Sequence, residues 1–193
     1  MAEYSLKDFV LDVEKAVRKL GNESSVMRVL KPKLEALITG PDRIPPSVFL
    51  PREDRFAMNL IQRPKDESFS IVGAVWKPGQ TTPIHDHLTW AMIGTCSGEE
   101  REAIFRRLDD GSNPEVARLT KVSERNNSKG HVTVLGSSGI HRVDNLGSGP
   151  ALSIHVYGRD IGPTVRHAYD PATGHISKFV SGYCNVMRDT DEY

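Results

Sequence analysis

The sequence predicts a mainly β protein: an antiparallel jelly-roll barrel or sandwich with N-terminal α-helices. Three observations support this. Apolar residues recur every three or four positions over the first forty residues, a proline-rich stretch follows, and short alternating apolar runs fill the rest of the chain. Those runs show no alternation with helices, so we expect antiparallel strands rather than parallel ones. At 193 residues, we expect a single domain spanning residues 1–193.

The helices are expected within residues 1–40. Ser5 and Asp8 form a capping-box pattern ahead of the first apolar stripe, and Gly21-Asn22 ends that helix. A second helix is expected over residues 26–38, with Pro32 inside its span. Residues 41–54 hold four prolines, so we interpret them as a linker.

Residues 55–193 are expected to form the β-barrel and a C-terminal tail. Turn residues cluster at 109–113 and at 126–128. Many short strands separated by turns are typical of a two-sheet jelly roll. The expected strands cover residues 56–60, 68–76, 82–95, 102–108, 115–121, 131–135, 141–145 and 151–157.

Charge and composition narrow the class of partner. Lys plus Arg and Asp plus Glu both number 25, which leaves no basic field to attract nucleic acid. There is no apolar run long enough to span a bilayer and no signal-peptide pattern. Two cysteines are too few for a disulfide framework. We therefore expect a cytoplasmic protein without nucleic-acid or membrane partners, and its oligomeric state stays open.

Three histidines form the strongest candidate site. Alternate residues of a strand point to one side, so His85 and His87 share a face while Asp86 points away. Ala91 would lie on the same face if the strand stayed regular, and its methyl group cannot bind a metal. His141, from a distant strand, would complete one side of a metal site. Imidazole suits Fe, Zn, Cu or Ni, and three neutral ligands leave the full metal charge to attract an anion such as a thiolate.

A second polar pattern lies on the strand expected at 151–157. Ser153, His155 and Tyr157 alternate with apolar residues, so their side chains share one face and can form a hydrogen-bonded chain. Burying three polar groups without partners is costly. The pattern therefore indicates either a functional relay or a satisfied polar network in the core.

The segment from Gly79 to Gly98 resembles the first motif of the cupin superfamily. Its glycines and His-x-His have the cupin spacing, and Ala91 stands where cupins have a glutamate ligand. Gly130, His141 and Asn145 match the register of the second cupin motif. The resemblance implies a cupin fold, that is, a double-stranded β-helix of jelly-roll type.

A larger set of residues resembles the thiol dioxygenases of the cysteine dioxygenase family. The resemblance implies that three histidines hold Fe(II), that a Ser-His-Tyr relay lies over the iron, and that both atoms of O2 are added to a thiol sulfur to give a sulfinate. The matching residues are His85-Asp86-His87, Trp90, Gly98-Glu99-Glu100, His141, Asn145, Ser153, His155 and Tyr157. By this resemblance His85, His87 and His141 bind the metal, and Ser153, His155 and Tyr157 are catalytic.

Departures from the family pattern bear on the substrate. Met58 stands where the mammalian-type cysteine dioxygenases have a carboxylate-binding arginine, so cysteine is disfavoured. Arg166 matches the position of the arginine that the bacterial 3-mercaptopropionate dioxygenases use instead. Met58 and Trp90 are expected to shape the substrate pocket. A dicarboxylate such as mercaptosuccinate would need a second cation, which Arg101 could supply.

These observations predict an Fe(II)-dependent thiol dioxygenase that uses O2 and a small mercapto-carboxylate, either 3-mercaptopropionate or mercaptosuccinate. One alternative is a cysteine dioxygenase. Others are a zinc or nickel cupin that catalyses hydrolysis or isomerisation, and a non-catalytic metal-binding cupin that senses a small acid. The relay of Ser153, His155 and Tyr157 argues against the last two, since neither chemistry needs it.

Overall fold

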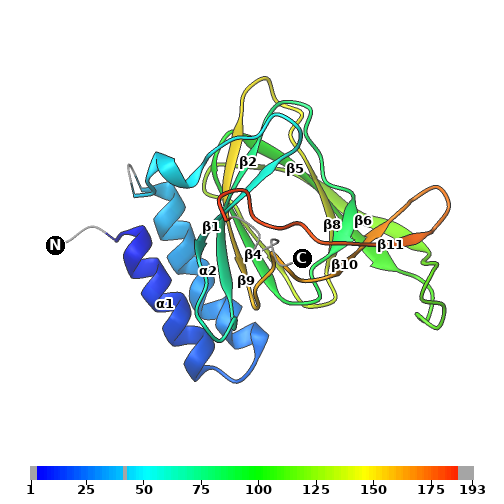
Figure 1. The fold of residues 1–193 in the computed structure, drawn as a ribbon, viewed down its shortest axis with the longest axis horizontal. Helices are drawn as coiled ribbons and strands as arrows, with labels where there is room; N and C mark the ends of the chain where they lie inside the picture. Colours follow the sequence, from blue (N-terminus) through cyan, green and yellow to red (C-terminus); the bar gives the residue numbers. More distant parts are fainter. Residues whose placement is uncertain (1–3, 41–42, 187–193) are drawn as a thin grey trace, which may run out of the picture.

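The structure, a computed structural model, describes residues 4–40 and 43–186 and consists of two helices beside two antiparallel sheets (Figure 1). The predicted mainly β fold with N-terminal helices is confirmed. Residues 1–3, 41–42 and 187–193, which include the end of the expected C-terminal tail, lie outside this description. The elements are α1 (Leu6–Lys19), α2 (Glu23–Thr39), a 3-10 turn (Pro46–Val48), β1 (Ala57–Gln62), β2 (Ser70–Trp76), β3 (Ile84–Asp86), β4 (Ala91–Ser97), β5 (Glu99–Arg107), β6 (Leu119–Ser128), β7 (Val132–Leu135), β8 (Ile140–Asp144), β9 (Ala151–Tyr157), β10 (Arg166–Tyr169) and β11 (Ile176–Phe179).

The first helix begins where its capping box predicts, and the second begins at Glu23, three residues before the expected start at residue 26. The Ser5 side chain accepts from the Asp8 amide, and the Asp8 carboxylate accepts from the Ser5 amide at 2.9 Å. Asn22 caps α2 by accepting from the Ser25 amide at 2.9 Å. Pro32 is accommodated within α2. No helix in the described part of the chain is long and apolar enough to cross a membrane.

The helix pair covers the outer face of a five-stranded sheet with the order β1-β2-β9-β4-β7 (Figure 1). Fully buried Leu30 and Leu34 of α2 share one core cluster with Ile154 and Val156 of β9. Burying each such side chain contributes about 1.5–3 kcal/mol. The helices therefore hold the outer face of β9, and its alternate residues are left to face the barrel interior.

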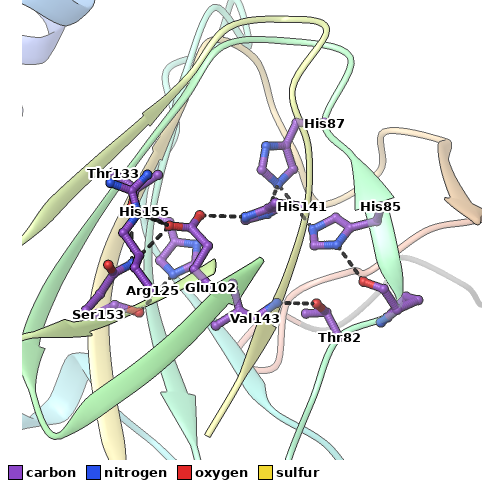
Figure 2. A network of polar contacts seen from close by, with 12 residues as sticks. Thr82, His85, His87, Glu102, Arg125, Thr133, His141, Val143, Ser153 and His155 are labelled. Carbon is purple, nitrogen blue, oxygen red and sulfur yellow. Dashed lines mark hydrogen bonds and ion pairs between the residues drawn. The ribbon is translucent and has the colours of Figure 1, made fainter. Parts of the chain in front are cut away.

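The second sheet has six strands in the order β11-β10-β3-β8-β5-β6. Because β3 and β8 are neighbours, His85 and His141 are directly paired across the ladder. The Val143 amide also donates to the Thr82 hydroxyl at 3.0 Å, which fixes β8 to the segment that precedes β3 (Figure 2).

The expected single strand over residues 82–95 is wrong, because the chain crosses from one sheet to the other in this stretch. β3 ends at Asp86 in the six-stranded sheet, and β4 begins at Ala91 in the five-stranded sheet. Leu88 lies at the crossing with a φ of 55°, a backbone conformation that breaks a regular strand. Ala91 instead pairs with Tyr157, so it does not continue the strand of His85.

Two other differences come from tertiary hydrogen bonds. The expected turn at residues 126–128 is the end of β6, because the Asn127 side chain is buried and donates to Glu102 at 2.9 Å. The β10–β11 hairpin was not expected from the sequence. The Asp86 carboxylate orders it by accepting from the His167 amide at 3.0 Å and from the Tyr169 hydroxyl at 2.8 Å.

After β11 the C-terminal segment (red) runs back across the barrel towards β1 (Figure 1). The Cys184 amide donates to the Met58 carbonyl at 2.8 Å, and Tyr183 donates its hydroxyl proton to Asp160 at 2.5 Å. These contacts hold residues 179–183 against the barrel, where Phe179, Val180 and Ser181 line its cavity.

We predict that Gly94→Ala lowers the free energy of unfolding by about 1–3 kcal/mol, because the new methyl group overpacks the helix–sheet interface. A Cβ at Gly94 would lie 3.0 Å from Leu34 Cγ and 3.0 Å from Ile38 Cδ1. Gly21→Ala is the matched control, since nothing lies within 4 Å of its Cβ position, and it is expected to be neutral or stabilising by up to about 1 kcal/mol. Urea unfolding measures both variants, and equal stabilities would contradict the packing argument.

Candidate metal centre

Three imidazole rings converge inside the barrel (Figure 2). His85 lies on β3, His87 lies just beyond its end, and His141 lies on β8. The Nε2 atom of His87 is 3.2 Å from that of His85 and 3.2 Å from that of His141. Among the described residues, these three histidines form a group that could hold a metal ion, because one nitrogen from each ring lies within 4.8 Å of the other two.

The opposite ring nitrogens of two of these histidines are held by acceptors. His85 Nδ1 lies 3.0 Å from the Pro83 carbonyl, and His141 Nδ1 lies 2.9 Å from Glu102 Oε1. Each Nδ1 therefore carries the proton, and each Nε2 directs its lone pair towards the shared centre. Burial lowers the pKa of both His85 and His87 well below the usual value, so both rings are neutral.

Glu102 is the buried carboxylate that orients His141. Burial by itself would raise its pKa, but the hydrogen bonds from His141, Thr133 and Asn127 outweigh burial and lower the pKa to about 2. The Thr133 hydroxyl donates at 2.6 Å and the Asn127 amide donates at 2.9 Å. Sequence reasoning missed Glu102. The signal was an acid at alternate positions of a strand, Glu100 and Glu102, on the face that points inward.

The donor set fits a non-haem transition-metal ion. Three neutral imidazole nitrogens suit iron, zinc, copper or nickel. Two nitrogens 3.2 Å apart can share one ion at about 2.0–2.1 Å from each. The lone pairs of His85 and His141 both point at His87 Nε2, which can satisfy at most one of them with a proton, whereas one metal ion can bind all three nitrogens. The geometry therefore supports a three-histidine metal site.

Ser153, His155 and Tyr157 lie on the inner face of β9 and form a continuous chain. Ser153 Oγ is 2.8 Å from His155 Nε2, and His155 Nδ1 is 2.8 Å from the Tyr157 hydroxyl. The Tyr157 ring packs edge-on to His87, with ring centroids 5.0 Å apart. Burial lowers the pKa of His155 to about 3 and raises that of Tyr157. The chain is thus made of neutral groups and ends beside a metal ligand.

A cavity of about 230 Å³ opens beside His85, His141 and Tyr157. Its wall is largely apolar, and it includes two arginines, Arg55 and Arg166. The Arg166 guanidinium lies over the Phe179 ring at 4.6 Å and donates to Ser181 Oγ at 2.8 Å. Its Nε is buried and has no hydrogen-bond partner among the described residues. This cation therefore retains hydrogen-bonding capacity for a ligand in the cavity.

Arg55 is the second cation of the cavity, and sequence reasoning missed its role. Its Nη1 donates to the Ser181 carbonyl oxygen at 3.2 Å. Ser181 thus contacts both guanidinium groups, Arg55 through its backbone and Arg166 through its side chain. The C-terminal segment brings the two cations to one wall of the cavity, although 111 positions (166 minus 55) separate them in the sequence.

Three sequence predictions concern the wall of this cavity. Met58 lines it as expected. Arg101 does not, because its inward-facing neighbours on β5 are Glu100 and Glu102; its own guanidinium points outward and donates to Asp144 at 2.9 Å. The prediction that Trp90 lines the pocket is also wrong, because Trp90 packs in the core cluster between the helices and the sheet. The chain crosses from one sheet to the other just before this residue.

A two-sheet jelly roll with a buried three-histidine site defines a metal-binding β-barrel protein. Residues 52–171 match the family described as cysteine dioxygenase type I. The chain belongs to this family. It is a cupin thiol dioxygenase with a three-histidine metal site.

Solved structures are similar at low identity. A protein from Thermus thermophilus is 17% identical, with a TM-score of 0.44, and the match covers 58% of this chain and 91% of that one. An oxalate oxidase in complex with the substrate analogue glycolate is 20% identical, with a TM-score of 0.44, over 56% of this chain and 53% of that one. The cupin domain of Schizosaccharomyces pombe Cnp3 is 10% identical, with a TM-score of 0.42, over 54% of this chain and 61% of that one.

We predict that Glu102→Gln weakens metal binding by about 10–100-fold, because the neutral amide no longer fixes the tautomer of His141. Competition with a chelator measures the affinity. Glu99→Gln, an exposed position on the same strand, is the control and should bind as wild type does. Equal affinities for the two variants would show that Glu102 does not support the metal site.

Proposed function

We propose that this protein is an Fe(II)-dependent dioxygenase of a small mercapto-carboxylate, with 3-mercaptopropionate and mercaptosuccinate as the candidate substrates. The reaction is RSH + O2 → RSO2⁻ + H⁺, in which the sulfur is oxidised and both oxygen atoms are retained. The observation that carries the proposal is one cavity that is lined by two of the three clustered histidines, His85 and His141, by the end of the Ser-His-Tyr chain and by two arginines. A metal-binding sensor would not require the polar chain.

His85, His87 and His141 would hold the iron. When bound, Fe(II) supplies the open coordination positions and the redox chemistry that thiol oxygenation needs. Because the three imidazoles are neutral, they would not offset the charge of the ion, and this charge would favour loss of the thiol proton. The apolar cavity wall excludes water, and fixed contacts between substrate and protein hold the reacting groups in register.

Arg166 is placed to bind the substrate carboxylate, because its planar guanidinium can donate two hydrogen bonds to a carboxylate. It lies on the same cavity as His85 and His141, so one substrate molecule can reach both the cation and the metal site. The hydroxyl of Tyr157 borders the same space and can donate a hydrogen bond to charge that develops on the reacting oxygen. His155 and Ser153 fix the orientation of Tyr157.

Arg55 favours a second carboxylate on the substrate. Two guanidinium groups on one cavity wall match a dicarboxylate better than a monocarboxylate, which makes mercaptosuccinate the stronger of the two candidates. The ammonium group of cysteine would enter a cavity that already holds two cations. Met58 adds only an apolar surface. For both reasons cysteine is the less favoured, alternative substrate.

We predict that the iron-loaded protein consumes O2 with mercaptosuccinate or 3-mercaptopropionate, and much less with cysteamine, which lacks a carboxylate. Oxygen-electrode traces with these three thiols and cysteine, followed by mass spectrometry for a product heavier by two oxygen atoms, measure the reaction. Stoichiometric zinc in the purified protein, together with no thiol-dependent O2 uptake after iron loading, would refute the proposal.

We predict that Arg55→Gln raises the KM for mercaptosuccinate about tenfold or more, since a hydrogen bond to a charged group contributes about 1.5–3 kcal/mol. The KM for 3-mercaptopropionate should change much less, because Arg166 still binds its single carboxylate. Arg101→Gln is the control for charge removal, because its guanidinium is bound to Asp144 on the outside of the barrel. An equal effect of Arg55→Gln on both substrates would remove the argument for a second carboxylate site.

A further inference from the structure

Glu100, the second buried carboxylate of β5, lies at the far end of the polar chain of β9. Glu100 and Glu102 occupy alternate positions of β5, so both point into the barrel. Glu102 holds His141, whereas Glu100 faces the Ser153 hydroxyl and the Trp76 indole. Only 1% of Glu100 is exposed, and its Oε1 has no hydrogen-bond partner among the described residues. Burying a carboxyl group with so few hydrogen-bond partners is costly, so Glu100 is a candidate for a functional role.

The surroundings of the two carboxylates shift their pKa values in opposite directions. Burial raises the pKa of Glu100 to about 7, and the charge of Glu102 adds to the rise, while hydrogen bonds from Ser153 and Trp76 oppose it. Burial raises the pKa of the Cys96 thiol on β4 to about 12, and the charge of Glu100 adds to the rise, so this thiol stays neutral. Glu100 thus changes its charge near neutral pH, and Glu102 remains ionised.

The chain that starts at Glu100 can carry its hydrogen bonds in either direction. His155 is neutral, because burial keeps its pKa near 3, so it has one N–H and one acceptor nitrogen. The Ser153 hydroxyl likewise has one proton to donate. Which nitrogen of His155 carries the proton is therefore decided by the group at the end of the chain.

When Glu100 is ionised, it can only accept. Ser153 then donates to Glu100 and accepts from His155 Nε2–H, which leaves His155 Nδ1 as an acceptor. The Tyr157 hydroxyl donates to that Nδ1, 2.8 Å away, and its single proton is used inside the chain. Tyr157 then has no proton to offer to the cavity.

When Glu100 is protonated, every bond of the chain reverses. Glu100 donates to Ser153, Ser153 donates to His155 Nε2, and His155 Nδ1–H donates to the Tyr157 oxygen. The Tyr157 hydroxyl is then free to donate to a group in the cavity beside His85 and His141. The same heavy-atom positions, 2.8 Å apart at both steps, serve both directions.

We propose that Glu100 is a positioning residue whose proton sets the direction of the Ser153–His155–Tyr157 hydrogen bonds, so that Tyr157 can donate to the substrate site only when Glu100 is protonated. The proposal rests on the thiol dioxygenase function for its effect on turnover. It adds to that function a residue that does not touch substrate or metal and acts through the tautomer of His155.

Turnover should fall as the pH rises. Below about pH 7 Glu100 is protonated and Tyr157 is available; above it, the carboxylate forms and Tyr157 is withdrawn. Wild-type kcat should therefore fall by more than about tenfold between about pH 6 and pH 9 through this ionisation. In Glu100→Gln the amide cannot ionise, so this fall is lost, whichever direction of the chain the amide selects.

The kinetic test compares the pH profiles of kcat for wild type, Glu100→Gln and the exposed control Glu99→Gln, with each protein iron-loaded. The ratio of each variant to wild type cancels the ionisation of the substrate thiol, which is common to all three. A ratio for Glu100→Gln that rises with pH, with a constant ratio for Glu99→Gln, supports the proposal. A constant ratio for both variants overturns it.

A second measurement does not depend on turnover. In the zinc-loaded, diamagnetic protein, the 15N chemical shifts of His155 report which ring nitrogen carries the proton. The proton should move from Nδ1 at low pH to Nε2 at high pH in wild type, and should stay on one nitrogen in Glu100→Gln. A wild-type tautomer that does not change between about pH 5 and pH 9 overturns the proposal, even if Glu100→Gln fails to fold.

The two measurements also separate this inference from the proposed function. A tautomer exchange in a protein that consumes no O2 with any thiol would support the coupling to Glu100 and refute the dioxygenase. Thiol-dependent O2 uptake without a tautomer exchange would support the dioxygenase and refute the role of Glu100.

Discussion

The interior of this barrel depends on one buried ion, the carboxylate of Glu102. An ionised carboxylate inside a protein costs several kcal/mol unless nearby donors replace its water. His141, Thr133 and Asn127 supply those donors. They lie on β8, β7 and β6, so the requirement ties three strands to β5 and links both sheets. The Glu102 carboxylate also fixes the ring of His141 and, through its charge, adds to the rise that burial causes in the pKa of Glu100.

Because side chains alternate along a strand, β9 has an apolar face towards the helices and a polar face towards the barrel interior. Ile154 and Val156 pack under the helices, where their burial stabilises the fold. Ser153 and Tyr157 project to the opposite side, where they extend the polar interior. A shift of the β9 register by one residue would exchange these faces and put three polar groups into the apolar layer. The hydrophobic layer outside the barrel therefore secures the polar chain inside it.

The sequence predicted local features well and long-range ones poorly. Motif spacing located the three histidines, and alternation within one strand located the polar chain of β9, because it decides which residues share a face. It failed for Trp90, since the crossing at Leu88 depends on which sheet each half of the segment joins. It chose Arg101 over Arg55 because the cavity wall is completed by the C-terminal segment, and contact between Arg55 and Ser181 spans 126 positions. No local pattern encodes such a contact.

The charges of the cavity account for the kind of molecule that can enter it. Arg55 and Arg166 face the same space as His85 and His141, and both guanidinium groups remain protonated in proteins. Adding a divalent ion to three neutral imidazoles makes this region still more positive, while the charge of Glu102 lies behind His141 and faces away from the cavity. In a low-dielectric interior such an excess is costly unless a ligand carries the opposite charge. A thiolate at the metal and carboxylates at the arginines would supply that charge, which ties the binding of the metal to the binding of an anionic substrate.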